Sequence, residues 1–508
     1  MHNYRKTSLL FLTLFCLIGL SQAQKIVYSE PDRDDGRRID FEIIGKINGN
    51  FLVYKNVRNE SFICVYDNDM KMVGKVKHDY MPDQRLINVD FFPYSDFTYM
   101  IYQYQRRGII HCMGVKIDGS GKKMEEAVEL DTTHIGITTN NKIYTSLSSE
   151  DKSKIIIFKI NSKNKERYVV TTKLFDNKLN FLRRDQLVMP MDERNDYLGE
   201  FLLDNEGNLV FTKYYRNSND NITSAYIVTK DAYADSFRYI PIEFKDMLLD
   251  ELRIKVDNFS KRYFINSFYV RQKRGNIEGM YFFVWDKTQQ AAMLNSSLEF
   301  SENLRREARD NGSFRTAFND FFIRSIITKA DGGFIVTSES YYTTSRSGLW
   351  NRWDYMYGSP FFSPMDYYYY SPYYSNWYWR SRNNTGNVRY HAENIVLLSF
   401  DKQGQLEWNN VIKKEQFDDE SDDRVSYQVM NTGGSLHFIF NIPEKRNLLL
   451  SDFALEPGGK INRNPTLKNL DKGYEFMTKY GKQVSARQMI IPCIYRNNYI
   501  CFAKLEYN

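Results

Sequence analysis

One run of carboxylates in the chain could bind a metal ion. Residues 418 to 423 read Asp-Asp-Glu-Ser-Asp-Asp, and such oxygen ligands suit a hard cation such as calcium. The run lacks the glycine and the ligand spacing of an EF-hand loop. We therefore expect a solvated loop whose negative charges repel one another, and we assign neither a metal ligand nor a cofactor.

The histidines and serines form no recognisable catalytic motif. Five histidines follow residue 23, and they are His78, His111, His134, His391 and His437. None belongs to an H-E-x-x-H pair, and the chain has no G-x-S-x-G elbow, Walker loop or Rossmann glycine fingerprint. His111 and His437 fall within strand patterns, which favours structural roles. We predict no catalytic residue.

Three carboxylates lie within or beside a segment rich in aromatic residues. They are Glu339, Asp366 and Glu393. A glycosidase needs two such groups roughly 5 to 9.5 Å apart, which a sequence cannot establish. A carbohydrate-active protein is therefore kept as the alternative to a non-enzymatic one.

Cysteine chemistry is limited to one candidate pair. Cys64, Cys112, Cys493 and Cys501 all lie in predicted strand cores, which argues against a reactive thiolate. Cys493 and Cys501 flank a predicted hairpin turn at residues 496–498. A three-residue loop places them opposite each other, whereas a two-residue loop pairs Cys493 with Phe502 instead. A disulfide and two buried thiols both remain open.

The strongest recognition feature is the aromatic segment, residues 341–390. Between Tyr341 and Trp379, 17 of 39 residues are aromatic, and three prolines interrupt any regular element. Tyr and Trp provide large contact areas at low entropic cost, so they suit binding surfaces. The alternatives are a segment folded against its own domain and a disordered one. The candidate binding residues are Trp350, Trp353, Tyr355, Tyr357, Tyr367, Tyr368, Tyr373, Trp377, Tyr378, Trp379 and Arg380.

The first residues predict export from the cytoplasm. Arg5 and Lys6 precede an apolar stretch from Leu9 to Leu20 and a small-x-small cleavage site, so we expect residues 1–23 to be a cleaved signal peptide. No later stretch is long and apolar enough to predict a transmembrane helix. Lys and Arg number 69 against 63 Asp and Glu, without a basic tract, so nucleic acid is not an expected partner.

A repeated unit of four short strands organises the rest of the chain. Strands rich in Val, Ile, Tyr and Phe alternate with turns of Gly, Asn and Asp. Units recurring every 45 to 55 residues predict an all-β fold, a β-propeller of eight four-stranded blades, with seven as the alternative. The last unit lacks one strand, which residues 25–28 would supply, so residues 24–508 form one expected domain. A short helical insertion is expected at residues 300–316.

Four long connections should share one face of this propeller. Strand two to strand three connections and blade-to-blade connections emerge on the same side. Residues 175–196, 300–316, 341–390 and 415–425 are all assigned to such connections. Binding commonly uses loops held by a rigid scaffold, so we expect this face to be the functional one.

The C-terminal half resembles a group of uncharacterised secreted β-propeller-like proteins from Gram-negative bacterial envelopes. The similarity covers about residues 250–508. It rests on Gly332-Gly333, Glu339, Gly404, Trp408, Gln416 and Tyr427, and on the D-x-x-G-x-x-x-W element from Asp401 to Trp408. The resemblance implies the fold and an envelope location, but no activity. Because the chain ends on its last strand without a sorting module, periplasm or outer membrane is expected ahead of free secretion.

These observations predict a non-enzymatic binding or scaffold protein. Its aromatic segment would dock a protein partner, an outer-membrane or export complex, because Tyr and Trp anchors often dominate protein interfaces. In the alternative, the same aromatic side chains stack against sugars.

Overall fold

The structure is a computed structural model in which only part of the chain is described. The described residues are 24–32, 36, 39–82, 86–135, 142–164, 166–191, 195–217, 221–273, 275–309, 316–345, 369–370, 388–419, 421–444, 447–465, 473–496 and 498–507. The expected signal peptide lies outside them.

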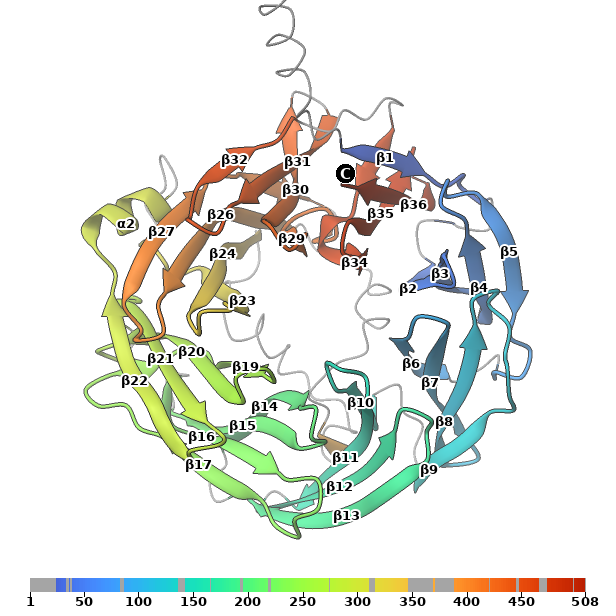
Figure 1. The fold of residues 1–508 in the computed structure, drawn as a ribbon, viewed down its shortest axis with the longest axis horizontal. Helices are drawn as coiled ribbons and strands as arrows, with labels where there is room; N and C mark the ends of the chain where they lie inside the picture. Colours follow the sequence, from blue (N-terminus) through green and yellow to red (C-terminus); the bar gives the residue numbers. More distant parts are fainter. Residues whose placement is uncertain are drawn as a thin grey trace, which may run out of the picture.

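Antiparallel sheets of about four strands follow one another around a ring, and the chain is an all-β protein with a β-propeller fold (Figure 1). The first three units are β2 (Asp40–Ile47), β3 (Asn50–Val57), β4 (Glu60–Tyr66) and β5 (Met72–Lys77); β6 (Leu86–Pro93), β7 (Phe97–Arg106), β8 (Ile109–Asp118) and β9 (Val128–His134); and β10 (Thr145–Ser148), β11 (Lys154–Asn164), β12 (Arg167–Asp176) and β13 (Phe181–Pro190).

The next four units lead to the C-terminal one. They are β14 (Asp196–Leu203), β15 (Leu209–Arg216), β16 (Ile222–Lys230) and β17 (Arg238–Ile242); β19 (Arg253–Asp257), β20 (Arg262–Val270), β21 (Gly279–Asp286) and β22 (Ala291–Glu299); β23 (Phe321–Thr328), β24 (Phe334–Ser345), β26 (Val388–Phe400) and β27 (Leu406–Ile412); and β29 (Tyr427–Asn431), β30 (Leu436–Glu444), β31 (Asn447–Leu455) and β32 (Ile461–Arg463).

The fourth and fifth units belong to one nine-stranded sheet. The two-residue strand β18 (Leu248–Leu249) pairs with β16 on one side and with β20 on the other. Counted as two units joined through β18, the described strands make eight units, so the expected number of eight blades depends on this interpretation.

The two ends of the chain close the ring together. Strand β1 (Lys25–Tyr28) pairs with β36 (Tyr499–Glu506), in the register Lys25↔Glu506 to Tyr28↔Ala503. Strand β36 pairs in turn with β35 (Gln488–Tyr495). Two short strands, β33 (Tyr474–Phe476) and β34 (Lys482–Ser485), complete this unit on either side of the 3-10 helix η1 (Thr478–Tyr480). The expected pairing of the N-terminal strand with the last blade is confirmed.

One long connection expected from the sequence, residues 175–196, contains a strand of the third unit. Residues 181–190 were assigned to a long connection, but they form β13, the outer strand of that unit. Its side chains are mostly exposed, and charged residues interrupt the apolar ones. Its pattern therefore resembles that of a loop more than that of a buried strand.

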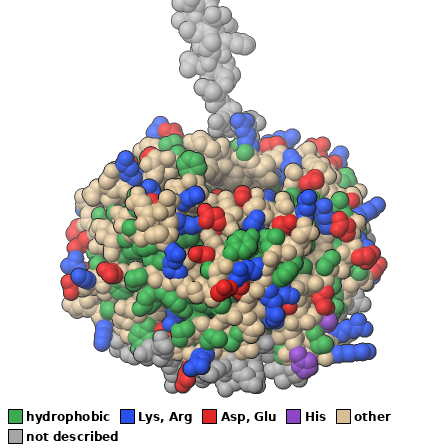
Figure 2. All heavy atoms as spheres, turned by 60° about the horizontal axis from the view of Figure 1, so that its bottom comes forward, with side chains coloured by type: hydrophobic (Ala, Val, Ile, Leu, Met, Phe, Trp, Pro, Cys, Tyr) green, Lys and Arg blue, Asp and Glu red, His purple; other side chains and the backbone are tan. Residues whose placement is uncertain are grey.

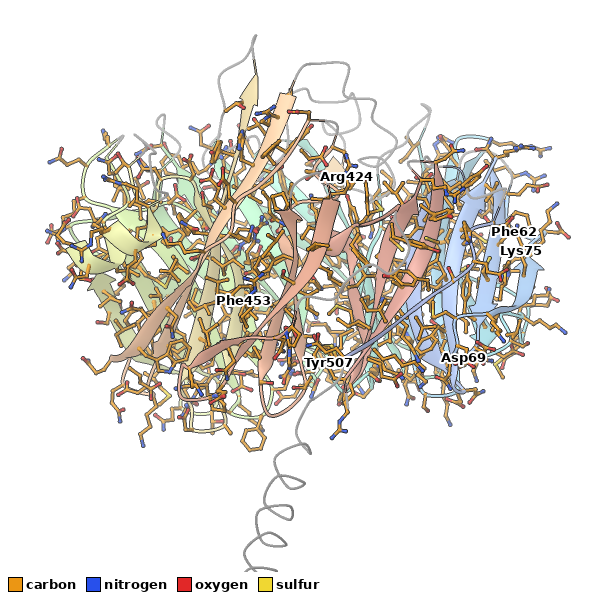
Figure 3. All side chains as sticks on the ribbon, turned by 90° about the horizontal axis from the view of Figure 1, so that it is seen from above. Phe62, Asp69, Lys75, Arg424, Phe453 and Tyr507 are labelled. Carbon is orange, nitrogen blue, oxygen red and sulfur yellow. The ribbon has the colours of Figure 1, made fainter. Side chains whose placement is uncertain are left out.

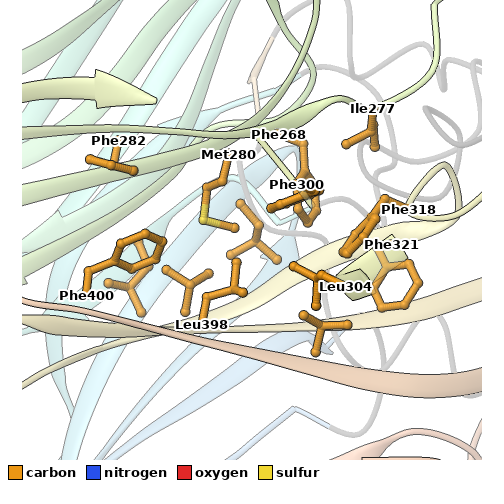
Figure 4. Close-up of a cluster of buried hydrophobic side chains, with 14 of the residues drawn as sticks. Phe268, Ile277, Met280, Phe282, Phe300, Leu304, Phe318, Phe321, Leu398 and Phe400 are labelled. Atoms are coloured by element: carbon orange, nitrogen blue, oxygen red, sulfur yellow. The ribbon is translucent and has the colours of Figure 1, made fainter. Parts of the chain in front are cut away.

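Apolar side chains between adjacent units form the core. The largest such cluster lies between the fifth and sixth units and includes Phe268, Phe282, Phe318 and Phe400 (Figure 4). Helix α2 (Glu302–Ala308) covers it, with Leu304 and Ala308 buried and the Ser301 side chain accepting from the backbone N–H of Leu304. The expected insertion is thus helical at residues 302–308. No helix in the described ranges has the length and apolar character to cross a bilayer.

The last hairpin has the register that places its cysteines opposite each other. Cys493 pairs with Cys501, and Tyr495 pairs with Tyr499, which corresponds to the three-residue loop. Both thiols are buried, and their sulfur atoms lie 3.3 Å apart. Burial raises the pKa of Cys493 well above its ordinary value, so its thiol is a poor nucleophile in the folded protein.

We expect these two cysteines to form a disulfide when the chain folds under oxidising conditions. A bond needs their sulfur atoms about 2.04 Å apart, which is a small movement for side chains already facing each other. After refolding in glutathione redox buffer, mass spectrometry should show a peptide linking Cys493 to Cys501 and the loss of two hydrogens. Cys64 and Cys112, which lie on separate strands, are the internal controls. The prediction is wrong if Cys64, Cys112, Cys493 and Cys501 can all be alkylated when the refolded protein is denatured without a reductant.

The ring has two faces. On the face we call the turn face, the short turns between the first and second strands of successive units bond to one another. The backbone N–H of Asn48 donates to Ser95 O at 2.9 Å, and that of Asn205 donates to Asn258 Oδ1 at 2.9 Å. Figure 3 shows Asp69 and Tyr507 toward this face and Arg424 at the opposite edge, which we call the loop face.

Three of the four expected connections reach the loop face in the described residues. Strands β24 and β26 end and begin there, residues 416–426 connect the sixth and seventh units there, and Arg305 of α2 donates to Ile277 O at 2.9 Å in a strand two to strand three connection. The fourth assignment is wrong, because residues 181–190 are a strand. The turn that precedes β13 lies instead on the turn face, where Tyr99 Oη donates to Asn177 O at 3.1 Å.

Candidate functional site

The aromatic segment leaves and re-enters the ring on the loop face. The eleven side chains expected to bind a partner, from Trp350 to Arg380, lie outside the described residues. Within the segment, the backbone of β25 (Tyr369–Tyr370) pairs with β11, in the register Tyr369↔Asn161 and Tyr370↔Ile160. The segment therefore connects the sixth unit, where it begins, to the third unit.

The stem of the segment is a regular antiparallel pair. Strands β24 and β26 remain paired up to Ser345↔Val388, so the first and last residues of the segment belong to this pair. Tyr342 stacks on His391 with ring centroids 4.5 Å apart, and its hydroxyl donates to Glu393. The stem thus presents the two ends of the segment directly opposite each other.

Below this stem lies a buried group of charged side chains. Glu339 on β24 forms ion pairs with Lys414 Nζ at 2.8 Å and with an Arg324 guanidinium nitrogen at 2.6 Å. The Ser426 hydroxyl also donates to Glu339, at 2.5 Å. Lys414 completes its bonds with the carbonyl of Ala392 at 2.9 Å and with Gln416 Oε1 at 2.7 Å. The side chains of Glu339 and Lys414 are both 0% exposed.

Neither described carboxylate of the suggested glycosidase set is free. Burial alone would raise the pKa of Glu339, but Lys414 and Arg324 outweigh it and lower that pKa. Burial lowers the pKa of Lys414. Glu339 is therefore held ionised inside the protein, while Glu393 is largely buried and accepts from Tyr342. Asp366 lies outside the described residues.

The acidic run is not the repelling loop that the sequence analysis expected. Four of its carboxylates pair with the following groups: Asp418 with Arg424, Asp419 with Arg389, Asp422 with Lys479, and Asp423 with the Tyr480 hydroxyl. Arg389 lies in β26, Arg424 directly follows the run, and Lys479 and Tyr480 lie in η1, so the run is joined to two other parts of the fold. In the described part of the chain, no three His, Cys, Asp or Glu side chains are grouped to hold a metal ion.

Three histidines, His78, His111 and His437, are held by contacts within the fold. Burial lowers the pKa of His78 to about 4, and its Nδ1 lies 2.8 Å from the Tyr80 hydroxyl. His437 lies 3.0 Å from Asp452, a carboxylate that is fully buried. His111 pairs with Glu129 on the neighbouring strand at 2.8 Å. Both His111 and His437 lie in strands, as expected.

Sequence reasoning missed the cations that surround this site. Arg324, Arg389, Lys414 and Arg424 all reach carboxylates of the loop face, but they are spread over residues 324–424 of a sequence that mixes both charges. Lys414 lies between β27 and β28 (Gln416–Asp418), and no apolar pattern in the sequence marks it as buried. The result is an ion-paired base that fixes the position of the stem.

Comparisons with known proteins identify no family. No family model matches the sequence, and no curated protein matches it. Among solved structures, it is similar to the WD40 domain of SCAP from fission yeast, with a TM-score of 0.43 and 10% identity over 95% of this chain and 98% of that chain.

Two further structures have comparable scores. The β-propeller domain of the Trilobed protease from Pyrococcus furiosus gives a TM-score of 0.37 and 10% identity over 84% of this chain and 95% of that chain. The polysaccharide lyase Uly1 gives a TM-score of 0.38 and 10% identity over 96% and 99%. We draw nothing about function from these likenesses.

Proposed function

We propose that this protein is a non-enzymatic binding scaffold whose aromatic segment docks a protein partner. The partner we favour is an outer-membrane or export complex, with the protein in the periplasm or at the outer membrane after removal of its signal peptide. The resemblance to secreted envelope proteins and the predicted signal peptide support this location.

One observation carries the proposal. The segment with the highest density of Tyr and Trp in the chain is inserted at the loop face, on a stem that stands on a fully buried ion-paired base. A rigid support lowers the entropic cost of binding, because the anchor points of the segment are already ordered. Rigid scaffolds commonly present binding residues in this way.

The stem also makes a clean deletion feasible. Because Ser345 and Val388 are paired, a Gly-Ser turn in place of residues 346–387 should close β24 and β26 into an ordinary hairpin. We expect the intact protein to capture a specific membrane partner from gently solubilised envelopes, and the deletion variant to lose it entirely. The measurement is affinity capture followed by mass spectrometry, with the thermal transition as the check that both proteins are folded.

A matched variant distinguishes the effect of the tryptophan side chains from the effect of the length of the segment. Alanine at Trp350, Trp353, Trp377 and Trp379 keeps the length of the segment and removes its largest anchors, so capture should fall to the level of the deletion. If both folded variants retain the same partners as the intact protein, the docking proposal is wrong. Binding of soluble glycans that those four substitutions abolish would instead favour the carbohydrate alternative.

A further inference from the structure

A cavity lies on the turn face, opposite the face on which β24 ends and β26 begins. It has a volume of about 250 Å³ and opens between the fourth and fifth units. Its walls include Glu206 and Asp231 from turns of the fourth unit, Arg238 from β17, and Trp285 and Lys287 from the fifth unit. Figure 2 brings forward the lower edge of the ring in Figure 1, where β13 and β17 lie, and acidic, basic and hydrophobic side chains are interspersed there.

Several walls of this cavity are held in place before any ligand binds. Lys287 Nζ lies 2.6 Å from Asp204 and 3.0 Å from Glu206. Asn208 donates to Asp204 at 2.9 Å and accepts from the backbone N–H of Ala232 at 2.7 Å. Asp204 itself is fully buried. Polar groups ordered in this way bind a ligand without the entropic cost of fixing them.

The charges of the cavity favour an uncharged ligand. Two carboxylates, Glu206 and Asp231, lie beside two cations, Arg238 and Lys287. Each cation has a carboxylate nearby, since Arg238 lies 3.9 Å from Asp231 and Lys287 is paired with Glu206. The two carboxylates and two cations give the cavity no net charge, so an anion or a cation gains little there. A ligand with many hydroxyl groups can donate hydrogen bonds to the carboxylates and accept them from the cations.

Two exposed aromatic rings lie in turns that adjoin lining residues of this cavity. Phe259 is 92% exposed and Tyr233 is 66% exposed, the two highest values among the large hydrophobic side chains described. Tyr233 follows the lining residue Asp231 in one turn. Phe259 lies in the turn that contacts the neighbouring one through Asn258, whose Oδ1 accepts from the backbone N–H of Asn205 at 2.9 Å. An exposed ring in a turn next to a polar cavity offers an apolar surface to a ligand that extends beyond the cavity.

We propose that this cavity binds one unit of a neutral carbohydrate and that Tyr233 and Phe259, in the adjacent turns, contact the adjoining units. A pyranose ring has hydroxyl groups around its edge and apolar C–H faces. The hydroxyl groups suit Glu206, Asp231, Arg238 and Lys287, and the half-buried Trp285 in the wall offers an apolar surface for a C–H face. This site is independent of the aromatic segment and of its proposed protein partner.

The test is ligand-observed NMR, with titration calorimetry of any binder, using the full protein. The probes are neutral trisaccharides of glucose, mannose, galactose or N-acetylglucosamine. We expect at least one to bind, and the double substitution Asp231→Ala with Arg238→Ala to weaken it about tenfold or more, because charged hydrogen-bonding groups are lost. Phe259→Ala should weaken a trisaccharide but not the corresponding monosaccharide.

Matched controls isolate the site. Arg271→Ala removes a comparably exposed arginine from the loop face, and Phe181→Ala removes an exposed ring from β13, so neither should change binding. The variant without residues 346–387 should also bind normally, which separates this proposal from the docking proposal. The proposal is wrong if no trisaccharide binds, if free amino acids bind there instead, or if the double substitution leaves the affinity unchanged.

Discussion

Substituting Lys414 by methionine should lower the free energy of unfolding by about 3–5 kcal/mol, since it leaves a buried carboxylate without its main partner. Glu339 is fully buried, and after the change only Arg324 and Ser426 would still bond to it. The carbonyl of Ala392 and the amide oxygen of Gln416 would also lose a donor. The measurement is urea unfolding followed by tryptophan fluorescence and circular dichroism.

The neighbouring residue offers a matched control for this prediction. Lys413 is exposed and donates to carbonyls at the end of α2, so Lys413→Met should cost less than about 1 kcal/mol. A double variant that combines Lys414→Met with Glu339→Gln should lose less than the sum of the two single changes, because no charge of the pair remains unpaired. If Lys413→Met and Lys414→Met lower the free energy of unfolding equally, the prediction is wrong, and the buried pair of Glu339 and Lys414 stabilises the fold no more than an exposed lysine does.

The fold could be predicted from the sequence because strands and turns are marked by local patterns of residues. Alternating apolar residues and Gly, Asn or Asp turns located most units, and the missing last strand pointed to residues 25–28. In the third unit, the prediction that residues 175–196 form a connection was wrong because the local pattern there does not resemble a strand. The strand from Phe181 to Pro190 is an outer strand in which Arg183, Arg184 and Asp185 interrupt the apolar residues, and its inward face is only half-buried apart from Met189.

The base of the aromatic segment could not be predicted for a different reason. Glu339 was noticed only as a possible catalytic group, while its partners Arg324 and Lys414 lie 15 and 75 residues away along the chain. Pairing over such separations is set by the arrangement of the sixth unit and its neighbour, and no local pattern encodes it. The same holds for Asp422 and Lys479, which turn an expected repelling loop into a cross-linked one.

Asp452→Ala should destabilise the protein at the closure of the ring. Asp452 on β31 is fully buried, and it accepts from the Tyr507 hydroxyl at 2.9 Å and from Asn464 Nδ2 at 2.7 Å. It also lies 3.0 Å from His437 Nδ1, and Gln24 donates to it. These partners come from both ends of the chain and from the seventh unit, so this one carboxylate connects the closing strands to their neighbour.

Removing it leaves several buried donors without an acceptor, each at about 1–3 kcal/mol, so we expect a total loss of at least about 3 kcal/mol. Tyr507→Phe removes one of these bonds and should cost about 1.5–3 kcal/mol, whereas Asp79→Ala, at an exposed turn, should cost less than about 1 kcal/mol. Hydrogen exchange should show the loss concentrated in β1 and β36, because their pairing closes the ring and Asp452 bonds to the residues beside them. Uniform loss of protection around the ring would contradict this prediction. It would mean that the propeller unfolds as a single cooperative unit, in which the pairing of β1 with β36 is no weaker than the contacts between other adjacent units.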